Sequence, residues 1–243
     1  MSANIPMLKL NHKLLLLVFL VPMVVLGQID TEEFGYSREF TWGINKNTNS
    51  GLIGGFSFKL ARKSGDQTYR TFGLDVLNVK HPKELRVPQG PTGSSFIFGK
   101  QNFLYSIRGH YGIERIIFRK ASQQGVQINV NAAGGPSLGI EAPYYVLAGG
   151  STEVYDPNLH TSPFSIQGSG RLFQGLGESK LIPGLNVRSS VLFEFGTFRK
   201  NVVGLELGLA AEAFSRKIII VPTHANRAIY TSAFFTLFWG SRK

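Results

Sequence analysis

Ser106, His110 and Glu114 carry the three functional groups of a hydrolytic triad, and they follow one another at a spacing of four residues. A nucleophile, its base and the carboxylate that orients the base must lie within hydrogen-bond reach of one another. On an extended strand, which rises about 3.3 Å per residue, positions four apart share a face but lie about 13 Å apart. These residues cannot form a triad by themselves, so partners from neighbouring strands would have to complete it. We expect His110 to belong instead to a network of charges.

A second group of potential ligands, Glu153, Asp156 and His160, lies close together in the sequence. Such side chains can hold a divalent cation, but their spacing matches no recognised metal-binding loop, and Asp156 before Pro157 is typical of a turn. The glycine-rich segment 168–177 lacks the lysine and the strand-to-helix context of a phosphate-binding loop. The sequence therefore predicts no metal site and no cofactor, and it predicts a flexible loop at 168–177.

Apolar and polar residues alternate along most of the chain, most regularly in 202–214. There Leu205 and Leu207 lie on one face of the pattern, and Glu206 and Glu212 lie on the other. A period of two marks a strand whose faces lie in different environments. Glycine and proline clusters separate eight such segments. The expected strands are 34–44, 52–62, 69–79, 102–114, 126–132, 185–198, 202–214 and 228–239.

The connections between these strands are short at one end and mostly long at the other. The short turns are 64–67, 119–124 and 199–201; the connections at the other end are 46–50, 80–101, 148–184 and 217–227. Outer-membrane barrels have short periplasmic turns, longer external loops and an even number of strands. The sequence thus predicts an all-β fold, a closed antiparallel up-and-down transmembrane β-barrel of eight strands.

The strand at 126–132 runs into a glycine-rich stretch, 134–145. Proline donates no hydrogen bond to a neighbouring strand. The strand can therefore continue only if Pro136 and Pro143 lie at bulges or beyond the membrane.

The polar faces of the expected strands carry both acids and bases. An eight-stranded barrel is just wide enough to be filled by side chains, and unpaired charges inside it would be costly. We therefore expect these groups to pair across the lumen, which argues against a wide diffusion pore. The predicted lumenal charge network is Glu39, Lys59, Asp75, Arg108, His110, Glu114, Arg188, Glu194, Glu206 and Glu212.

Several aromatic residues lie near strand ends or on outward faces, as the interfacial girdle of a membrane protein requires. Aromatic residues are also common in strands of every kind, which is the alternative explanation. The expected interfacial aromatics are Trp42, Tyr105, Tyr111, Tyr230 and Trp239.

The N-terminus has the organisation of an export signal. Lys9 and Lys13 precede the apolar run 14–26, which is shorter than the roughly 20 residues needed to span a bilayer. We expect residues 1–27 to be a signal peptide cleaved after Gly27, and 28–243 to form one barrel domain. The alternative is a transmembrane anchor.

The formal net charge of +11 and the absence of cysteine limit the possible partners. Without cysteine, neither a disulfide framework nor a thiolate metal site can form. A basic balance suits nucleic acid or anionic lipid headgroups. Because no nucleic-acid motif accompanies an export signal, we expect lipid and no nucleic acid.

Several short motifs resemble uncharacterised outer-membrane β-barrel proteins of Bacteroidota. They are the runs 105–111 (YSIRGHY), 134–139 (GGPSLG), 143–145 (PYY), 155–157 (YDP) and 175–178 (GLGE). The resemblance covers most of the mature chain and implies fold and location, but that family has no settled activity to carry over. One departure lies at the end of the chain, where Gly240 to Lys243 follow the aromatic pair Phe238 and Trp239.

These observations favour an exported outer-membrane barrel without catalysis, with a structural or interaction role. Its filled lumen would anchor long external loops, 80–101 and 148–184, that present a surface to other envelope proteins. Two alternatives stay open. One is a lipid-modifying barrel enzyme similar to a lipid A deacylase, and the other is a soluble secreted barrel that binds an apolar ligand in its lumen. The soluble barrel would reverse the two faces of every strand.

Overall fold

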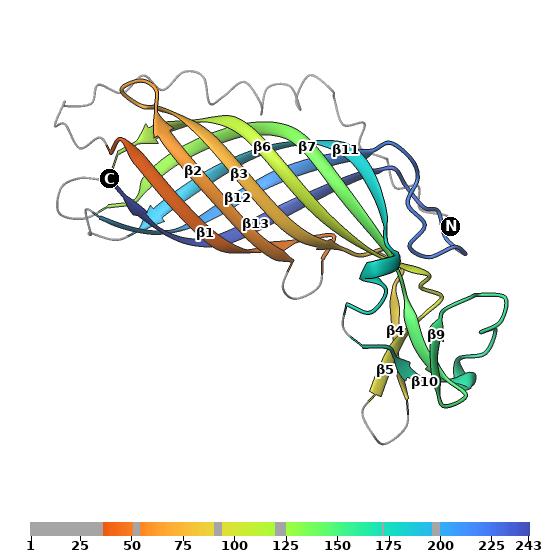
Figure 1. Ribbon diagram of the computed structural model, residues 1–243. Coiled ribbons are helices and arrows are strands. Elements are labelled where there is room, and N and C mark those ends of the chain that lie inside the picture. The colour runs from red at the N-terminus through yellow and green to blue at the C-terminus, as the bar shows by residue number, and fades with distance from the viewer. Residues whose placement is uncertain (1–35, 51–53, 90–93, 120–124, 172, 196–199) are drawn as a thin grey trace, which may run out of the picture. The chain divides into compact units, whose positions relative to one another are not determined.

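Eight long strands of the computed structural model pair into a closed antiparallel barrel (Figure 1). The structure describes residues 36–50, 54–89, 94–119, 125–171, 173–195 and 200–243. The barrel strands are β1 (Arg38–Asn47), β2 (Gly55–Lys63), β3 (Thr68–Val79), β6 (Asn102–Phe118), β7 (Gln127–Pro143), β11 (Lys180–Phe195), β12 (Asn201–Phe214) and β13 (Ile229–Arg242). Their order around the barrel is β1-β13-β12-β11-β7-β6-β3-β2. The expected all-β, closed up-and-down barrel of eight strands is confirmed.

The two faces of the barrel wall differ in polarity. On β1, Phe40, Trp42 and Ile44 point outward and are 47%, 46% and 37% exposed, whereas Glu39 and Asn45 point inward and are buried. The other barrel strands repeat this pattern, with outward-facing apolar residues that include Phe56, Phe58, Phe72, Leu74, Val76, Ile113, Leu185, Val187, Val203, Leu207, Leu209, Phe235 and Leu237. The alternative of a soluble barrel with an apolar lumen is therefore wrong, because most large apolar side chains of the wall face outward and the lumen is lined by charged and polar groups.

The strand boundaries differ from expectation at several ends. β1, β6 and β7 run to Asn47, Phe118 and Pro143, past the expected ends at 44, 114 and 132. β11 begins at Lys180, ahead of the expected start at 185, and β13 continues past Trp239 to Arg242. The turn 64–67 follows β2 as expected, and Ser64 N donates to Thr68 O at 2.9 Å. Residues 120–124 and 196–199 lie outside the described residues, so the other two predicted turns are described only in part.

Of the two placements expected for Pro136 and Pro143, the bulge is wrong for Pro136, because this residue lies within β7 and the register does not shift there. Pro143 is the last residue of β7. The pairs Arg108↔Ser137 and Tyr111↔Gly134 keep one register on either side of Pro136. Between them no β6 partner is assigned to Pro136, which has no N–H to donate. The strand thus continues through the proline at the cost of a gap in one hydrogen-bond ladder.

Two of the long connections fold into small sheets, here called the loop module (Figure 1). They contain β4 (Leu85–Gln89), β5 (Ser94–Phe98), β8 (Tyr145–Ala148), β9 (Ser151–Val154), β10 (Ile166–Ser169), and the 3-10 helices η2 (Pro163–Ser165) and η3 (Leu176–Glu178). β4 pairs with β5, and the other sheet has the order β10-β8-β9. The flexible loop predicted at 168–177 is therefore wrong at both ends, where β10 and η3 form. None of the helices in the described part of the chain is long and apolar enough to cross a membrane.

The loop module has an apolar core of its own, formed by Phe96, Ile97, Tyr144, Val146, Tyr155 and Ile166. A second apolar cluster closes the same end of the barrel, where the segment 215–228 folds back onto the wall. Ile218 and Ile220 of that segment are fully buried, and Gln101 N donates to Ile220 O at 2.8 Å. At the opposite end, called the turn end, Ser37 N and Arg38 N donate to Lys243 O at 2.8 and 2.9 Å.

Candidate functional site in the barrel lumen

All ten residues of the predicted charge network lie on the lumenal face of the wall. They come from six strands: β1, β2, β3, β6, β11 and β12. Nine of them are buried, and the side chain of Lys59 is 10% exposed. Removing charges from water is expensive unless they meet partners of opposite sign, so the contacts of these groups decide what the lumen can do.

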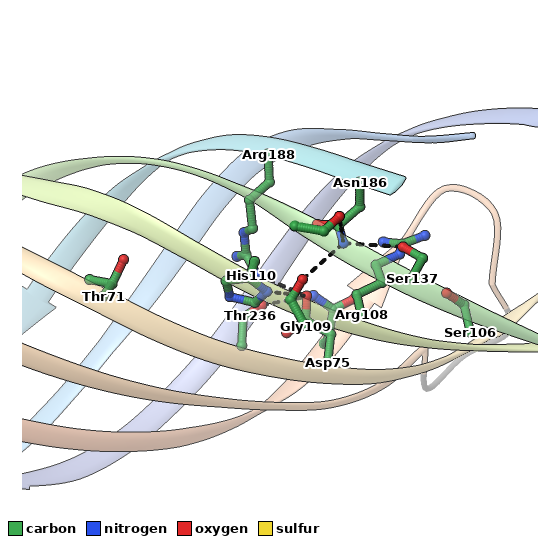
Figure 2. Close-up of polar contacts among 12 residues, drawn as sticks. Thr71, Asp75, Ser106, Arg108, Gly109, His110, Ser137, Asn186, Arg188 and Thr236 are labelled. Atoms are coloured by element: carbon green, nitrogen blue, oxygen red, sulfur yellow. Dashed lines mark hydrogen bonds and ion pairs between the residues drawn. The ribbon is translucent and has the colours of Figure 1, made fainter. Parts of the chain in front are cut away.

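Arg188 on β11 joins carboxylates from two other strands. Its Nη1 lies 2.9 Å from Asp75 Oδ2, and its Nη2 lies 2.6 Å from Glu206 Oε1. Ser190 Oγ also donates to Glu206 Oε1, at 2.5 Å. The ring of Phe234 lies 4.4 Å from the guanidinium carbon, a cation–π contact that explains why this aromatic residue faces the lumen. Figure 2 shows Arg188 and Asp75 pointing toward one another across the lumen.

A second cluster combines Arg108 and Ser106 of β6 with Glu212 of β12. Arg108 Nη2 lies 2.7 Å from Glu212 Oε2, and Ser106 Oγ donates to Glu212 Oε1 at 2.5 Å. The serine hydroxyl is thus engaged with a carboxylate that is already paired with a cation.

A third cluster surrounds Glu114 of β6. Lys59 Nζ lies 2.5 Å from Glu114 Oε2, and Asn129 Nδ2 donates to Glu114 Oε1 at 2.7 Å. Lys59 also lies 5.8 Å from the centre of the Phe238 ring. Phe238 also packs against Leu192 and Val202 on the inner face of the wall.

Arg242 is a lumenal residue that the sequence prediction missed. It pairs with Glu39 through Nε at 2.6 Å and with Glu194 through Nη1 at 2.7 Å, and its Nη2 also contacts Glu194. Its guanidinium carbon lies 3.9 Å from the centre of the Tyr36 ring. The signal was present in the sequence, because the inward parity of Phe234 and Phe238 reaches Arg242 if β13 is extended beyond Trp239.

The residues of the hypothetical triad do not come together as a catalytic unit. Ser106 contacts Glu212 and Glu114 contacts Lys59, as described above. His110 Nδ1 lies 4.0 Å from Asp75 Oδ2, too far for a hydrogen bond. The ring lies against Gly73 so closely that a Cβ there would overlap it. The described residues thus offer no serine activated by His110.

Asn186 fills the gap that Pro136 leaves between β6 and β7 (Figure 2). Its Nδ2 lies 3.1 Å from both Gly109 O and Gly135 O, 3.0 Å from Pro136 O and 3.1 Å from Ser137 Oγ. A buried carbonyl without a donor is costly. An asparagine from β11 therefore supplies a donor where the proline removed one.

The spaces between the lumenal side chains are small. One cavity, lined by residues that include Asp75, His110 and Arg188, measures about 20 Å³. Another, lined by residues that include Asn186 and Arg188, measures about 10 Å³. A single water molecule needs roughly 10 to 15 Å³ measured this way. These two cavities hold about one water each and do not make a channel.

Of the second candidate group, Glu153, Asp156 and His160 in the loop module, only Glu153 and His160 join through their side chains. His160 Nε2 lies 2.9 Å from Glu153 Oε1, while His160 Nδ1 contacts the backbone of Asp156. The Asp156 carboxylate instead accepts from Asn158 N at 2.8 Å, as expected of a turn. In the described part of the chain no group of three or more histidine or acidic residues is placed to hold a metal ion.

Four of the five predicted interfacial aromatics, Trp42, Tyr105, Tyr111 and Trp239, lie on the outer wall, at different heights. Trp42 and Trp239 are cross-strand partners with ring centroids 5.4 Å apart. Tyr105 lies toward the loop-module end of β6. The expectation for Tyr230 is wrong, because this residue shares the inward face of β13 with Ser232 and packs against the buried apolar cluster, its ring centroid 6.0 Å from that of Phe214. Tyr111 lies near the middle of β6 and accepts a hydrogen bond from Arg70 Nη1 at 2.5 Å.

The loop module contains a buried ion pair that the sequence prediction also missed. Lys100 is fully buried; its Nζ lies 2.8 Å from Glu84 Oε1 and 4.2 Å from the centre of the Phe103 ring. Burial lowers the pKa of Lys100, and the Glu84 carboxylate opposes that shift. Glu84 and Lys100 lie in segments that lack the alternation of apolar and polar residues from which the barrel strands were predicted. That pattern therefore gave no indication of this ion pair.

By its geometry, the chain is a closed eight-stranded antiparallel barrel with a side-chain-filled, charge-paired lumen. No family model matches the sequence, and no curated protein matches it. Among solved structures, 85% of this chain aligns with 97% of Ail, the attachment invasion locus protein of Yersinia pestis, in complex with the heparin analogue sucrose octasulfate, at 9% identity and a TM-score of 0.39. Neisserial surface protein A (NspA) aligns over 85% of this chain and 96% of its own, at 13% identity and a TM-score of 0.39. These low values transfer no function to this chain.

Proposed function

We propose that this protein is an outer-membrane β-barrel with a structural or interaction role, in which a filled, non-catalytic barrel anchors the loop module outside the cell. The observation that carries the proposal is the polarity of the wall, apolar outside and charged inside. Water would penalise such an exposed apolar surface, whereas a bilayer would not.

The dimensions of the apolar face suit a bilayer. On β1 the outward apolar residues Phe40, Trp42 and Ile44 lie between two outward cations, Arg38 and Lys46. Eight residues of strand span about 26 Å, and strands tilted by about 40° would cover about 20 Å of the membrane normal. The apolar band of outer-membrane barrels is about 25 Å tall.

The folded loop module supports an interaction role. Its two sheets pack around the apolar core described above, so it presents a defined surface rather than a set of loose loops. Exposed apolar residues on this module include Leu85, Leu159 and Phe164. In the proposed orientation the turn end faces the periplasm. The loop module, which lies between β3 and β6 and between β7 and β11, meets other envelope proteins.

The remaining elements of the proposal come from the sequence. They are export through a signal peptide, residues 1–27, the placement of Trp42, Tyr105, Tyr111 and Trp239 at the membrane interfaces, and a source among Bacteroidota. The intact mass of the purified mature protein tests the first of these directly, because cleavage after Gly27 leaves a chain that begins at Gln28.

Membrane fractionation followed by heat-modifiability on a detergent gel tests the proposed function. We expect recovery in the outer membrane and a change of mobility on boiling, because a folded barrel resists the detergent until it is heated. Recovery of the folded protein in the soluble fraction would overturn the proposal.

A further inference from the structure

Three arginines form a row across the outer wall at the turn end. Arg38 on β1 is the cross-strand partner of Arg62 on β2, which is the partner of Arg70 on β3. All three side chains are exposed and point outward. Arg115, outward on β6, lies beside this row as the partner of Thr68.

The protein does not balance these charges. Like charges directly opposite one another on neighbouring strands destabilise a sheet. Among the described residues no carboxylate lies within 4.0 Å of the guanidinium groups of Arg38, Arg62 or Arg70. The side-chain partners of Arg70 are neutral: Ser64 Oγ at 3.3 Å and Tyr111 Oη at 2.5 Å. The row therefore differs from the lumen, where each arginine of the network meets a carboxylate.

The row lies at the edge of the apolar face. Two residues further along the same strands, Phe40, Leu60 and Phe72 form the next row of outward cross-strand partners. The row after that is Trp42, Phe58 and Leu74. A molecule that fits both rows carries negative charge at one end and an apolar chain at the other.

We propose that the row of Arg38, Arg62 and Arg70 binds the phosphate of an anionic phospholipid, whose acyl chains lie against Phe40, Leu60 and Phe72. Guanidinium groups bind phosphate oxygens in bidentate fashion, and the row offers three of them side by side. The Tyr111 hydroxyl, which contacts Arg70, borders the same site. The inference rests on the proposed function, because it places the turn end, and with it the lipid, in the periplasmic leaflet.

Native mass spectrometry of the folded protein, released from micelles that contain equal amounts of phosphatidylglycerol and phosphatidylcholine, tests the site. We expect the wild-type protein to retain phosphatidylglycerol preferentially. In R38Q/R62Q/R70Q we expect that preference to fall by about 10-fold or more, since each cation near an anionic lipid surface contributes about 1 kcal/mol.

The matched control is K83Q/R86Q/R171Q, which removes three exposed cations from the connections that form the loop module. It should keep the wild-type preference. If the triple variant fails to fold, R62Q alone removes the central cation and should lower the preference by a smaller factor. Equal lipid preference in wild type and variants, or an equal loss in the control, would overturn the inference. A wild-type protein recovered in the soluble fraction would instead overturn the proposed function.

Discussion

The barrel and the loop module place polar and apolar residues in opposite ways. The barrel surrounds an interior of charged groups, such as Asp75, Arg188 and Glu206, and shows apolar residues on its outside. The loop module does the reverse around Phe96 and Ile166. Burying apolar surface is favourable because it removes that surface from water. The loop module, with its apolar core, is therefore suited to water, whereas the outer wall of the barrel is suited to an apolar environment.

The largest expected effect comes from leaving a buried charge unpaired. R188L strands Asp75 and Glu206 in the lumen and should destabilise the folded barrel by about 3 to 5 kcal/mol. Urea unfolding in detergent micelles, followed by tryptophan fluorescence, measures the loss. R171L is the control, because Arg171 is exposed and makes no ion pair among the described residues, so its loss should change stability by no more than about 0.5 kcal/mol. Similar losses for the two variants would contradict the account.

The next effect concerns the outer wall. Leu207 lies outward near the middle of β12, and L207R should destabilise the protein in phospholipid vesicles by about 2 to 4 kcal/mol, as expected for a charge at the bilayer midplane. The matched change in the loop module is L159R, at a residue that is 75% exposed, and it should have little effect. Unfolding measurements in vesicles compare the two variants. Equal stabilities of L207R and L159R would indicate that the outer wall faces water and would contradict the account.

A smaller effect is expected in the core of the loop module. I166V removes one methyl group from a fully buried side chain and should cost about 0.5 to 1.5 kcal/mol. Hydrogen exchange should show faster exchange in β8 and β10, while the barrel strands keep their protection. I219V, at an exposed position, serves as the control. A loss of protection that spread through the barrel would show that the two regions unfold together.

The smallest effect is a dependence on alkaline pH. Burial raises the pKa of Tyr144, whose hydroxyl accepts a hydrogen bond from Ile97 N at 3.0 Å. The unfolded chain loses this proton near pH 10, so the contribution of Tyr144 to stability is complete below that pH and is lost as the pH rises through the folded-state pKa.

Hydrogen exchange of the loop module at increasing pH measures this loss. Y144F should lower stability at neutral pH by about 1 kcal/mol through the missing hydrogen bond, but it should weaken the dependence above pH 10. An unchanged dependence in Y144F would assign the alkaline loss to another group.

Much of the barrel could be predicted from sequence because its wall separates two environments. That separation imposes the period of two that located Glu206 and Glu212 on one face of β12 and Leu205 and Leu207 on the other. The same parity led to the ten residues that the structure places in the lumen.

The misses have identifiable physical causes. Phe234 and Phe238 face inward and contact cations, which hid the parity of β13 and with it Arg242. Pro136 sits inside a strand because Asn186, far away in sequence, supplies a donor. The short strands of the loop module carry too few alternating residues to be recognised, and their pairing depends on contacts such as Lys100 with Glu84.

The central claim, that the apolar outer wall lies in lipid, can be tested with the native tryptophans. The chain has two, Trp42 and Trp239, and both lie on the outer wall. In vesicles of lipids brominated along the acyl chains, the account predicts strong quenching of tryptophan fluorescence relative to unbrominated vesicles. Equal fluorescence in the two kinds of vesicle, from folded and vesicle-bound protein, would contradict it.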